Sequence, residues 1–435
     1  MRRAPPALAF LCLLAAGALA SAAPQAPPNG APQEAPPAAG PAPGADLVAR
    51  GKYLATLGDC TGCHTRPGGA PYEGGLGLGS PFGTIYTANI TSDPKVGIGS
   101  WSADQFWRAL HEGRRNDGAH LYPAFPYPYF THVTREDSDA LRAYLLSVPA
   151  SSYRPPANKL IFPVNIRGAM AIWNALFFRA EPFTGRADQS AEWNRGAYIV
   201  TGLGHCGACH TPKNMLQADS RSKPLQGGKI ENWFAPDLDG SPRGLASWSR
   251  DDIVEFLKTG RNARSNGGAS MAAVLVHSTT QMTDEDRRDI AVYLKSLPPS
   301  DAPASRGAAQ DVMAQGGAVY RDECSACHGV NGAGEPRLFP ALRNDANVQQ
   351  RDPTTMVRYI LTGSQTASSA ARPTAFTMPA FSWKLNDREV AAVATYVRNS
   401  FGNNAQPVSA SEVANLRHKV AAHPIQKELP AAEQR

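Results

Sequence analysis

Three short stretches decide how this chain folds: Cys60-Thr61-Gly62-Cys63-His64, Cys206-Gly207-Ala208-Cys209-His210 and Cys324-Ser325-Ala326-Cys327-His328. Each has the form C-x-x-C-H, the attachment signature of c-type haem, with two thiols for thioether bonds and a histidine for the iron. Two intervening residues bring both sulfurs to one edge of the macrocycle, and the next residue turns its imidazole under the iron. The sequence therefore predicts three covalently bound haem c groups, attached through Cys60, Cys63, Cys206, Cys209, Cys324 and Cys327, with His64, His210 and His328 as iron ligands.

The cysteine count favours haem over other uses of paired cysteines. The 435-residue chain has seven cysteines, of which Cys12 lies near the N-terminus and the other six complete the three motifs. A disulfide does not require a histidine after each pair. Because all three motifs also occupy the same place in a repeat, we expect neither a zinc site nor a redox dithiol.

The motifs are embedded in a pattern that recurs three times along the chain. A short helical stretch precedes each motif (50–53, 195–198 and 316–320), and a loop and a second helix follow it, beginning near Ser102, Ser249 and Pro353. An amphipathic helix ends each copy, over 134–147, 283–297 and 386–400, with Tyr144, Tyr293 and Tyr396 in matching places. We predict domains at 46–149, 187–300 and 308–402.

The N-terminus is typical of an exported protein. Two arginines, an apolar run and small residues give residues 1–22 the layout of a signal peptide, and the run is too short to favour an uncleaved anchor. Residues 23–45 are rich in Pro and Ala and are expected to form a spacer. The net charge of +6 comes without any block of basic residues, so we expect no nucleic-acid binding.

Two further segments admit more than one interpretation. The connector 150–186 is rich in proline and aromatic residues, including Met170, Trp173, Phe177 and Phe178, and serves either interdomain packing or the docking of a partner. The tail 403–435 holds one expected helix, capped by Ser409 with Glu412 and ended by Pro424. Its apolar stripe of Val413, Leu416 and Val420 is narrow and favours packing on the protein over contact with lipid.

All three segments resemble class I cytochrome c domains. The span 46–418 resembles the triheme cytochrome c subunits of bacterial membrane-associated dehydrogenases acting on alcohols, gluconate, sorbitol, fructose, aldehydes or N-heterocycles. The stretches that carry the resemblance are 120–127, 248–254, 259–262 and 378–381. The resemblance implies an all-α fold of three tandem class I cytochrome c domains. It also implies electron transfer, without substrate chemistry, from a dehydrogenase catalytic subunit to quinone or the respiratory chain, in a periplasmic protein peripherally associated with the outer face of the cytoplasmic membrane.

In this family the second iron ligand usually comes from a methionine in the loop before the last helix. The third segment has one methionine there, Met378. The second has Met271 and Met282, and counting back 11 residues from the matching tyrosines places Met282 with Val133 and Leu385 at a core position. Met271 is therefore predicted as the ligand, with two core methionines as the alternative.

The first segment departs from this pattern. Phe125 stands where the spacing calls for a methionine, and phenylalanine cannot bind iron. The first haem is then open or water-bound, or is ligated by His120 in the same loop, or takes a distant residue such as Met170. His111 is expected within the second helix and His132 facing water. The histidine-orienting carbonyl that the family draws from a proline segment is expected at Pro236 and Pro340, with Ala88 uncertain in that role.

Two other functions stay open. A free-standing soluble multihaem carrier would purify alone, without a dehydrogenase. A peroxidase-like reaction at the first haem would reveal itself by turnover with peroxide and an electron donor.

Overall fold

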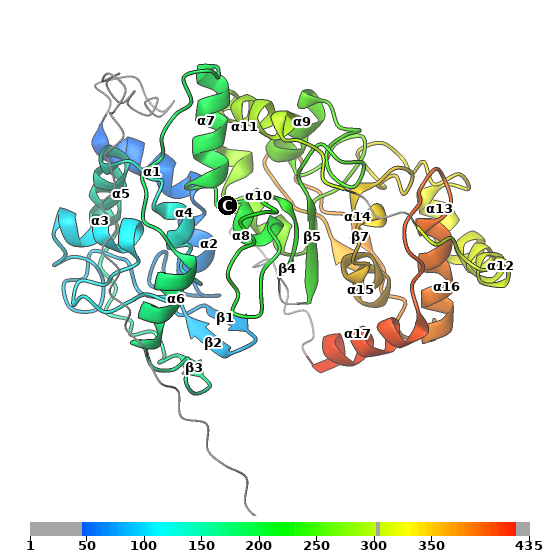
Figure 1. The fold of residues 1–435 in the computed structure, drawn as a ribbon, viewed down its shortest axis with the longest axis horizontal. Helices are drawn as coiled ribbons and strands as arrows, with labels where there is room; N and C mark the ends of the chain where they lie inside the picture. Colours follow the sequence, from blue (N-terminus) through cyan, green and yellow to red (C-terminus); the bar gives the residue numbers. More distant parts are fainter. Residues whose placement is uncertain (1–45, 231, 302–304, 423–435) are drawn as a thin grey trace, which may run out of the picture. The chain divides into compact units, whose positions relative to one another are not determined.

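A computed structural model of the chain describes residues 46–230, 232–301 and 305–422, all within one unit, Glu34–Arg435. In each motif-bearing segment the first and last helices pack against each other (Figure 1). The pairs are α1 (Leu47–Leu57) with α5 (Arg135–Ser147), α7 (Ala191–Thr201) with α11 (Asp284–Ser296), and α12 (Gln310–Val319) with α16 (Asp387–Arg398). The predicted signal peptide 1–22 and spacer 23–45, and the end of the tail, lie outside the described residues.

A glycine allows each helix pair to approach closely. A Cβ built on Gly51, Gly196 or Gly316 would lie 1.9, 2.0 or 2.1 Å from a backbone oxygen of the partner helix, so any larger residue would force the helices apart. The same positions lie beside the Cβ atoms of Tyr144, Tyr293 and Tyr396, which confirms that these tyrosines match.

The third copy of the repeat differs from the other two in its first helix. Because Gly316 packs as Gly51 and Gly196 do, Ala318 takes the place of Tyr53 and Tyr198. The third segment therefore has no tyrosine at this position, and Tyr320 lies two residues further along the chain.

The predicted helix starts agree with the structure. Ser102 and Ser249 cap α3 (Ala103–Glu112) and α9 (Arg250–Thr259), each with a reciprocal bond from the third helical residue. Pro353 is the N-cap of α15 (Thr354–Thr362), one position earlier than expected. Side chains of Thr134, Thr283 and Asn386 cap the three last helices.

Small antiparallel sheets make the all-α prediction too narrow. Strands β1 (Gly77–Ser80), β2 (Gly83–Tyr86) and β3 (Lys159–Leu160) form one sheet, while β4 (Gln226–Ile230) pairs with β5 (Trp233–Asp237) and β6 (Ser364–Gln365) with β7 (Thr377–Met378). Strands β1 and β2 form within the loop after the motif helix α2 (Cys60–His64), β3 comes from the connector, and β4 and β5 form within the loop after the motif helix α8 (Gly207–His210). In the second segment, β5 contains Pro236, whose carbonyl group is directed at the motif histidine His210.

The third segment and the tail share one core. Helix α17 (Ala410–Ala422) packs on α15 and α16, and its cap between Ser409 and Glu412 is present as predicted. Val413, Leu416 and Val420 are buried in this core, which confirms packing on the protein for that stripe. The motif helix α13 (Ser325–His328) follows a π-helical turn, η2 (Tyr320–Cys324), and α14 (Ala346–Gln349) lies before α15.

The first and second segments are joined by a reciprocal pair of contacts. Each of two buried aspartates accepts bonds from an arginine of its own segment and from a tyrosine of the other. Asp137 is bonded by Arg50 (2.5 Å) and Tyr198 (2.6 Å), and Asp286 by Arg195 (2.8 Å) and Tyr53 (2.5 Å). The two segments also share one hydrophobic core.

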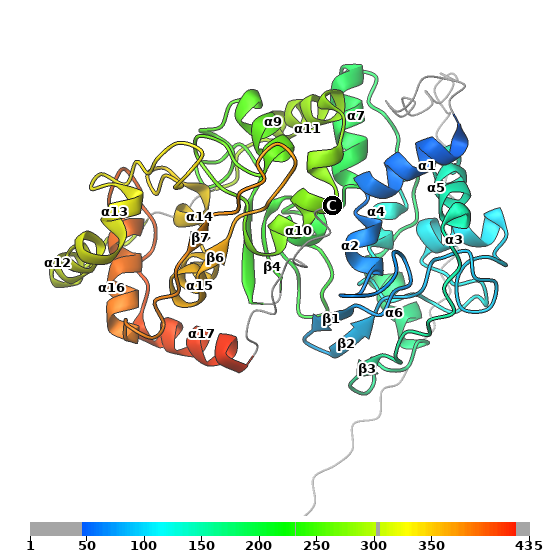
Figure 2. The same cartoon turned by 180° about the vertical axis from the view of Figure 1, so that it is seen from behind.

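The connector packs across both of these segments. Its helix α6 (Ala169–Phe177) buries Met170 and Trp173 against Tyr127 of α4 (Tyr127–Phe130) and against Ala218 of the second segment. Figure 2 shows α6 beside the β1–β3 sheet. The remaining short helices are α10 (Ala269–His277) and η1 (Thr279–Gln281). Within the described ranges, no helix has both the length and the apolar character needed to cross a bilayer.

Candidate functional site

Each motif histidine is held by a backbone carbonyl. The Nδ1 atoms of His64, His210 and His328 lie 2.7, 2.7 and 2.9 Å from the carbonyl oxygens of Ala88, Pro236 and Pro340. Because a carbonyl oxygen only accepts, each Nδ1 carries the proton and donates it. The expected acceptors Pro236 and Pro340 are confirmed, and Ala88 plays the same part in the first segment.

This bond leaves Nε2, the other ring nitrogen of each histidine, without a proton, so its lone pair is available to a metal. Burial lowers the pKa of His64, His210 and His328, since it disfavours the imidazolium form, so all three rings are neutral near pH 7. A neutral imidazole with its Nδ1 proton fixed by an acceptor is the form that binds a metal through Nε2.

The motif thiols lie in apolar surroundings. No disulfide joins the six motif cysteines of the described residues. Burial raises the pKa of Cys60, Cys63 and Cys206 to about 12 and that of Cys324 to about 11. Paired thiols that face an apolar space are suited to bonds with a hydrophobic macrocycle and poorly suited to redox exchange, which requires thiolate.

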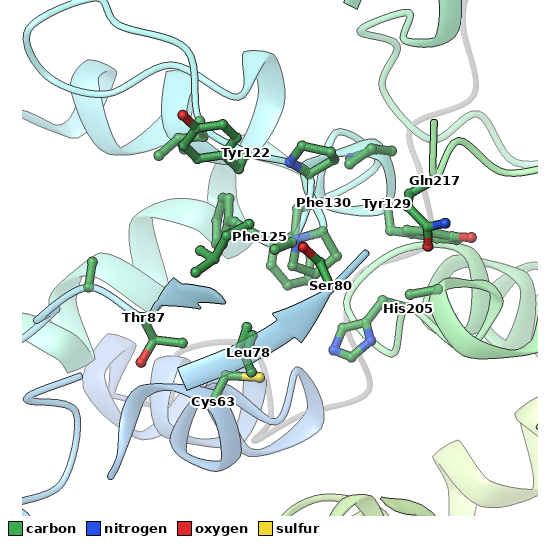
Figure 3. A pocket seen from close by; sticks show the side chains of 18 of the residues that line it. Cys63, Leu78, Ser80, Thr87, Tyr122, Phe125, Tyr129, Phe130, His205 and Gln217 are labelled. Atoms are coloured by element: carbon green, nitrogen blue, oxygen red, sulfur yellow. The ribbon is translucent and has the colours of Figure 1, made fainter. Parts of the chain in front are cut away.

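A large cavity adjoins the first motif. It has a volume of about 2330 Å³ and is lined by Cys60, Cys63 and His64 together with apolar residues such as Leu110 and Leu145. Ordinary small-molecule pockets have about 300–1,000 Å³. Figure 3 shows side chains of two segments around it, with Cys63 from α2 and His205 from the turn before α8. The space, the thiol pair and the oriented histidine fit a haem.

The structure places Phe125 on the wall of this cavity, as its spacing predicted. Its ring lies edge-to-face on Phe130, 5.2 Å between centroids. Within the described residues, those that line the cavity include neither His111 nor His120. Asn174 of the connector donates to Nδ1 of His120 (3.0 Å), and this histidine remains one of the open alternatives as a ligand.

The other two histidines of this segment are bonded within the protein. Nδ1 of His111, in α3 as expected, lies 2.9 Å from the carbonyl oxygen of Thr131. His132 was expected to face water, but its Nδ1 donates to Thr201 of the second segment (2.8 Å) and its ring is half-buried. The reason is the close packing of the two segments, which a pattern within one segment cannot reveal.

The predicted methionine ligands have different surroundings. Met378 lies in β7 and packs against the core cluster that includes Cys324. Met282 is buried in the core with Cys206, as expected for a structural methionine. Met271, in α10, packs with Leu275 and Ala367 in a separate cluster, so the structure does not bring it to Cys206, and its assignment stays a prediction.

Two residues directly before the motifs were not singled out from the sequence. Asp59 is buried beside Cys60 and Cys63, and burial raises its pKa to about 7. His205 is half-buried on the cavity wall, with its ring centroid 5.7 Å from that of Phe130. Each precedes a motif cysteine, a place next to the haem edge, and this position is the signal that could have identified them.

The first and second motifs lie near each other. The pKa of the Cys63 thiol is raised mainly by burial, and also by charge on Cys209, which therefore lies close by. A Cβ on Gly207 would meet the hydroxyl of Tyr129 at 2.6 Å, so the second motif helix abuts the first segment. The first and second motifs are therefore held beside each other.

Comparison with known proteins agrees with this geometry. The family model named Cytochrome c matches residues 194–298 and 313–401. The chain is 40% identical to the gluconate 2-dehydrogenase cytochrome c subunit of Pantoea cypripedii over 415 residues, covering 89% of this chain and 94% of that protein. This chain belongs to the cytochrome c subunits of membrane dehydrogenases.

Other members of the family are almost as similar. The quinone-dependent alcohol dehydrogenase cytochrome c subunit of Gluconacetobacter polyoxogenes is 40% identical over 401 residues, covering 86% of this chain and 85% of that protein. The fructose dehydrogenase cytochrome subunit of Gluconobacter japonicus is 34% identical over 403 residues, 85% of this chain and 82% of that subunit. As a cytochrome c, the protein holds haem c covalently and transfers electrons.

Proposed function

We propose that the protein is a triheme electron-transfer subunit that passes electrons from a periplasmic dehydrogenase catalytic subunit to quinone or the respiratory chain. The observation that carries this proposal is the same histidine–carbonyl bond at all three motifs. The family model covers the second and third segments, and the first repeats their helix pair, glycine crossing and thiol pair. Residues 46–149 therefore form a third class I cytochrome c domain, in tandem with 187–300 and 308–402.

The names of the relatives indicate which class of protein is the partner. The relatives are named as cytochrome subunits of gluconate, alcohol and fructose dehydrogenases. These dehydrogenases differ in substrate, whereas their cytochrome subunits are similar in sequence to this chain. A shared cytochrome with varied partners fits a carrier that performs no substrate chemistry. The signal-peptide layout of residues 1–22 supports export to the periplasm, with peripheral association at the outer face of the membrane.

The residues of each site have separable tasks. Haem, when bound, supplies the iron that takes up and releases one electron at a time. The cysteine pairs fix its edge, while His64, His210 and His328 present Nε2 to the metal and are kept in one orientation by their carbonyl partners. Met378 and Met271 are proposed as the opposite ligands, since a thioether favours the ferrous state relative to nitrogen. The apolar walls exclude water.

The haem count tests the proposal. A pyridine haemochrome assay on the matured protein should give three haems per chain, and the double substitution Cys60→Ala with Cys63→Ala should give two. The matched control is Met215→Ala, a fully exposed residue outside the motifs, which should leave three. Two or fewer haems in the unaltered protein would contradict the proposal. Purification from membranes should also recover a dehydrogenase, and recovery of the cytochrome alone would favour the free-standing carrier.

One observation favours a second candidate function. Phe125 lines the first cavity and supplies no ligand, so an iron left open there could react with peroxide. Steady-state oxidation of an electron donor by peroxide tests this, with Phe125→Met as the control that should close the site. Absence of turnover would eliminate peroxidase activity.

A further inference from the structure

The connector helix α6 exposes apolar side chains and directs its polar one inward. Its sequence, Ala169–Phe177, contains one polar residue, Asn174, and this residue points inward. Tyr127 donates a hydrogen bond to Oδ1 of Asn174 (2.6 Å), and Nδ2 of Asn174 donates to His120 (3.0 Å). The exposed positions of the helix are instead apolar, with Ile172 at 68% and Leu176 at 62% exposure. A surface helix normally shows the opposite arrangement.

The apolar surface continues into the chain just before α6. Ile161, Phe162 and Ile166 are also exposed, Phe162 at 75%. Turn hydrogen bonds from Asn165 to Ile161, from Ile166 to Pro163 and from Ala169 to Ile166 keep this stretch close to the helix. We call Ile161, Phe162, Ile166, Ile172 and Leu176 the connector face. Large apolar residues exposed together mark an interaction surface.

The charges of the chain stretch that carries the connector face all have one sign. Between Asp139 and Glu181 the chain has no acidic residue, while the same stretch contains Arg142, Arg154, Lys159, Arg167 and Arg179. Arg154, Lys159 and Arg179 are exposed. A loop of the second segment flanks α6, since Trp173 donates to the carbonyl of Leu216 (2.9 Å) and Arg221 to that of Phe177 (2.9 Å). Arg221 adds another cation at this edge.

We infer that the connector face inserts into the surface of an anionic lipid bilayer. This inference rests on the proposed function, for which it supplies the site of peripheral membrane association. Exposed apolar side chains bordered by Lys and Arg are the combination that binds an anionic membrane interface. A second copy of the chain is disfavoured as occupant, because a symmetric contact would bring these cations together.

The inner face of the same helix lines the cavity of the first motif. Met170, Trp173 and Phe177 belong to its wall, as do Cys60 and Cys63. One helix thus separates the proposed lipid surface from the first haem site. Membrane docking through α6 would hold that haem site close to the lipid phase.

The test is vesicle flotation of the haem-loaded full-length protein. With vesicles of phosphatidylcholine and phosphatidylglycerol the protein should float, and with phosphatidylcholine alone it should float less. The double substitution Ile172→Ser with Leu176→Ser should weaken partitioning at least tenfold. The control is Leu47→Ser with Trp383→Ser, which removes two exposed apolar residues elsewhere and should leave flotation unchanged. Lys159→Glu with Arg179→Glu should remove the preference for anionic vesicles.

The haem spectrum of the same samples separates the two proposals. Unchanged reduced-minus-oxidised spectra show that each variant is folded and loaded. A fully reducible protein that fails to float, or an Ile172→Ser, Leu176→Ser variant that floats like the unaltered protein, would overturn the inference and leave the electron-transfer role standing. Flotation lost equally in the control would also overturn it, because binding would then not depend on the connector face. A haem count below three would contradict the proposed function without affecting the flotation result.

Discussion

The first and third segments have the same helix pair and the same histidine–carbonyl bond, and differ on the opposite side of the site. In the third, Met378 packs with the core that includes Cys324, whereas in the first, Phe125 lines the cavity next to Cys60. The surroundings differ as well. The first segment exchanges tyrosine contacts with the second, while the third has Ala318 at that position. The difference shows that a shared fold fixes the proximal side of the site and leaves the distal side free to vary.

The largest expected effect comes from removing the methionine. Met378→Ala should lower the potential of one haem by on the order of 0.2 V, because loss of the thioether favours ferric iron and axial ligands act over a range of about 0.8 V. Potentiometric titration followed by absorbance measures it. Met356→Ala, a buried methionine of α15, is the control and should leave the potentials in place. Met271→Ala should lower the potential of a second haem, and an unchanged titration would show that Met271 is a core residue.

The converse change should make the first site resemble the third. Phe125→Met should raise the lowest potential by roughly 0.1–0.2 V and abolish binding of cyanide or carbon monoxide, since the thioether would fill the open position. Electron paramagnetic resonance of the purified protein gives the starting state, high-spin for an open site. Three indistinguishable His/Met haems before substitution would contradict this, and would point to a distant methionine such as Met170.

The hydrogen bonds by which Tyr53 and Tyr198 join the first two segments can be removed without altering the haem sites. Tyr198→Phe removes a hydrogen bond to the buried carboxylate of Asp137 and should cost about 2 kcal/mol of unfolding free energy. Tyr53→Phe should cost less because its hydroxyl lies nearer to solvent. Urea unfolding of the haem-loaded protein measures both. Equal stability of Tyr198→Phe and the unaltered protein would show that the contact between the segments contributes little.

A smaller difference lies one residue before the motifs. Asp59 is buried with its pKa raised to about 7, whereas Glu323, before Cys324, is paired with Lys384 (2.6 Å). As pH rises through 7, Asp59 loses its proton and adds negative charge beside the first haem, which stabilises ferric iron and lowers the potential. The slope should reach up to about 59 mV per pH unit. Asp59→Asn should flatten it, and a slope that persists in this variant would assign it to another group.

Much of this arrangement could be predicted from local sequence. Caps such as Ser102 and Thr283 are determined within one turn, so the helix starts could be predicted directly, and the matching tyrosines identified the last helix of each copy. The histidine acceptors at Pro236 and Pro340 followed from resemblance. Short strands did not, because two-residue pairings such as β6 with β7 have almost no pattern of their own.

What escaped prediction depends on contacts between segments. His132 was assigned to solvent because its own helix pattern says nothing of Thr201 in the next segment. Tyr53 and Tyr198 gave no sign that each binds the other segment's aspartate. The sequence left the connector open between interdomain packing and partner docking. In the structure Trp173 is buried, which confirms packing, while Ile172 on the outer face of the same helix is exposed, and docking stays a prediction.

The helix crossing also affects how haem can be attached while the protein matures. In each segment the motif comes early in the chain and the helix that closes the fold comes last, so α5 follows Cys63 by some 70 residues. Once α1 and α5 have met, apolar surroundings raise the pKa of Cys60 and Cys63 to about 12, and hardly any thiolate exists at neutral pH to react. We therefore expect haem attachment to be faster while the segment is still open than after α5 has packed on α1.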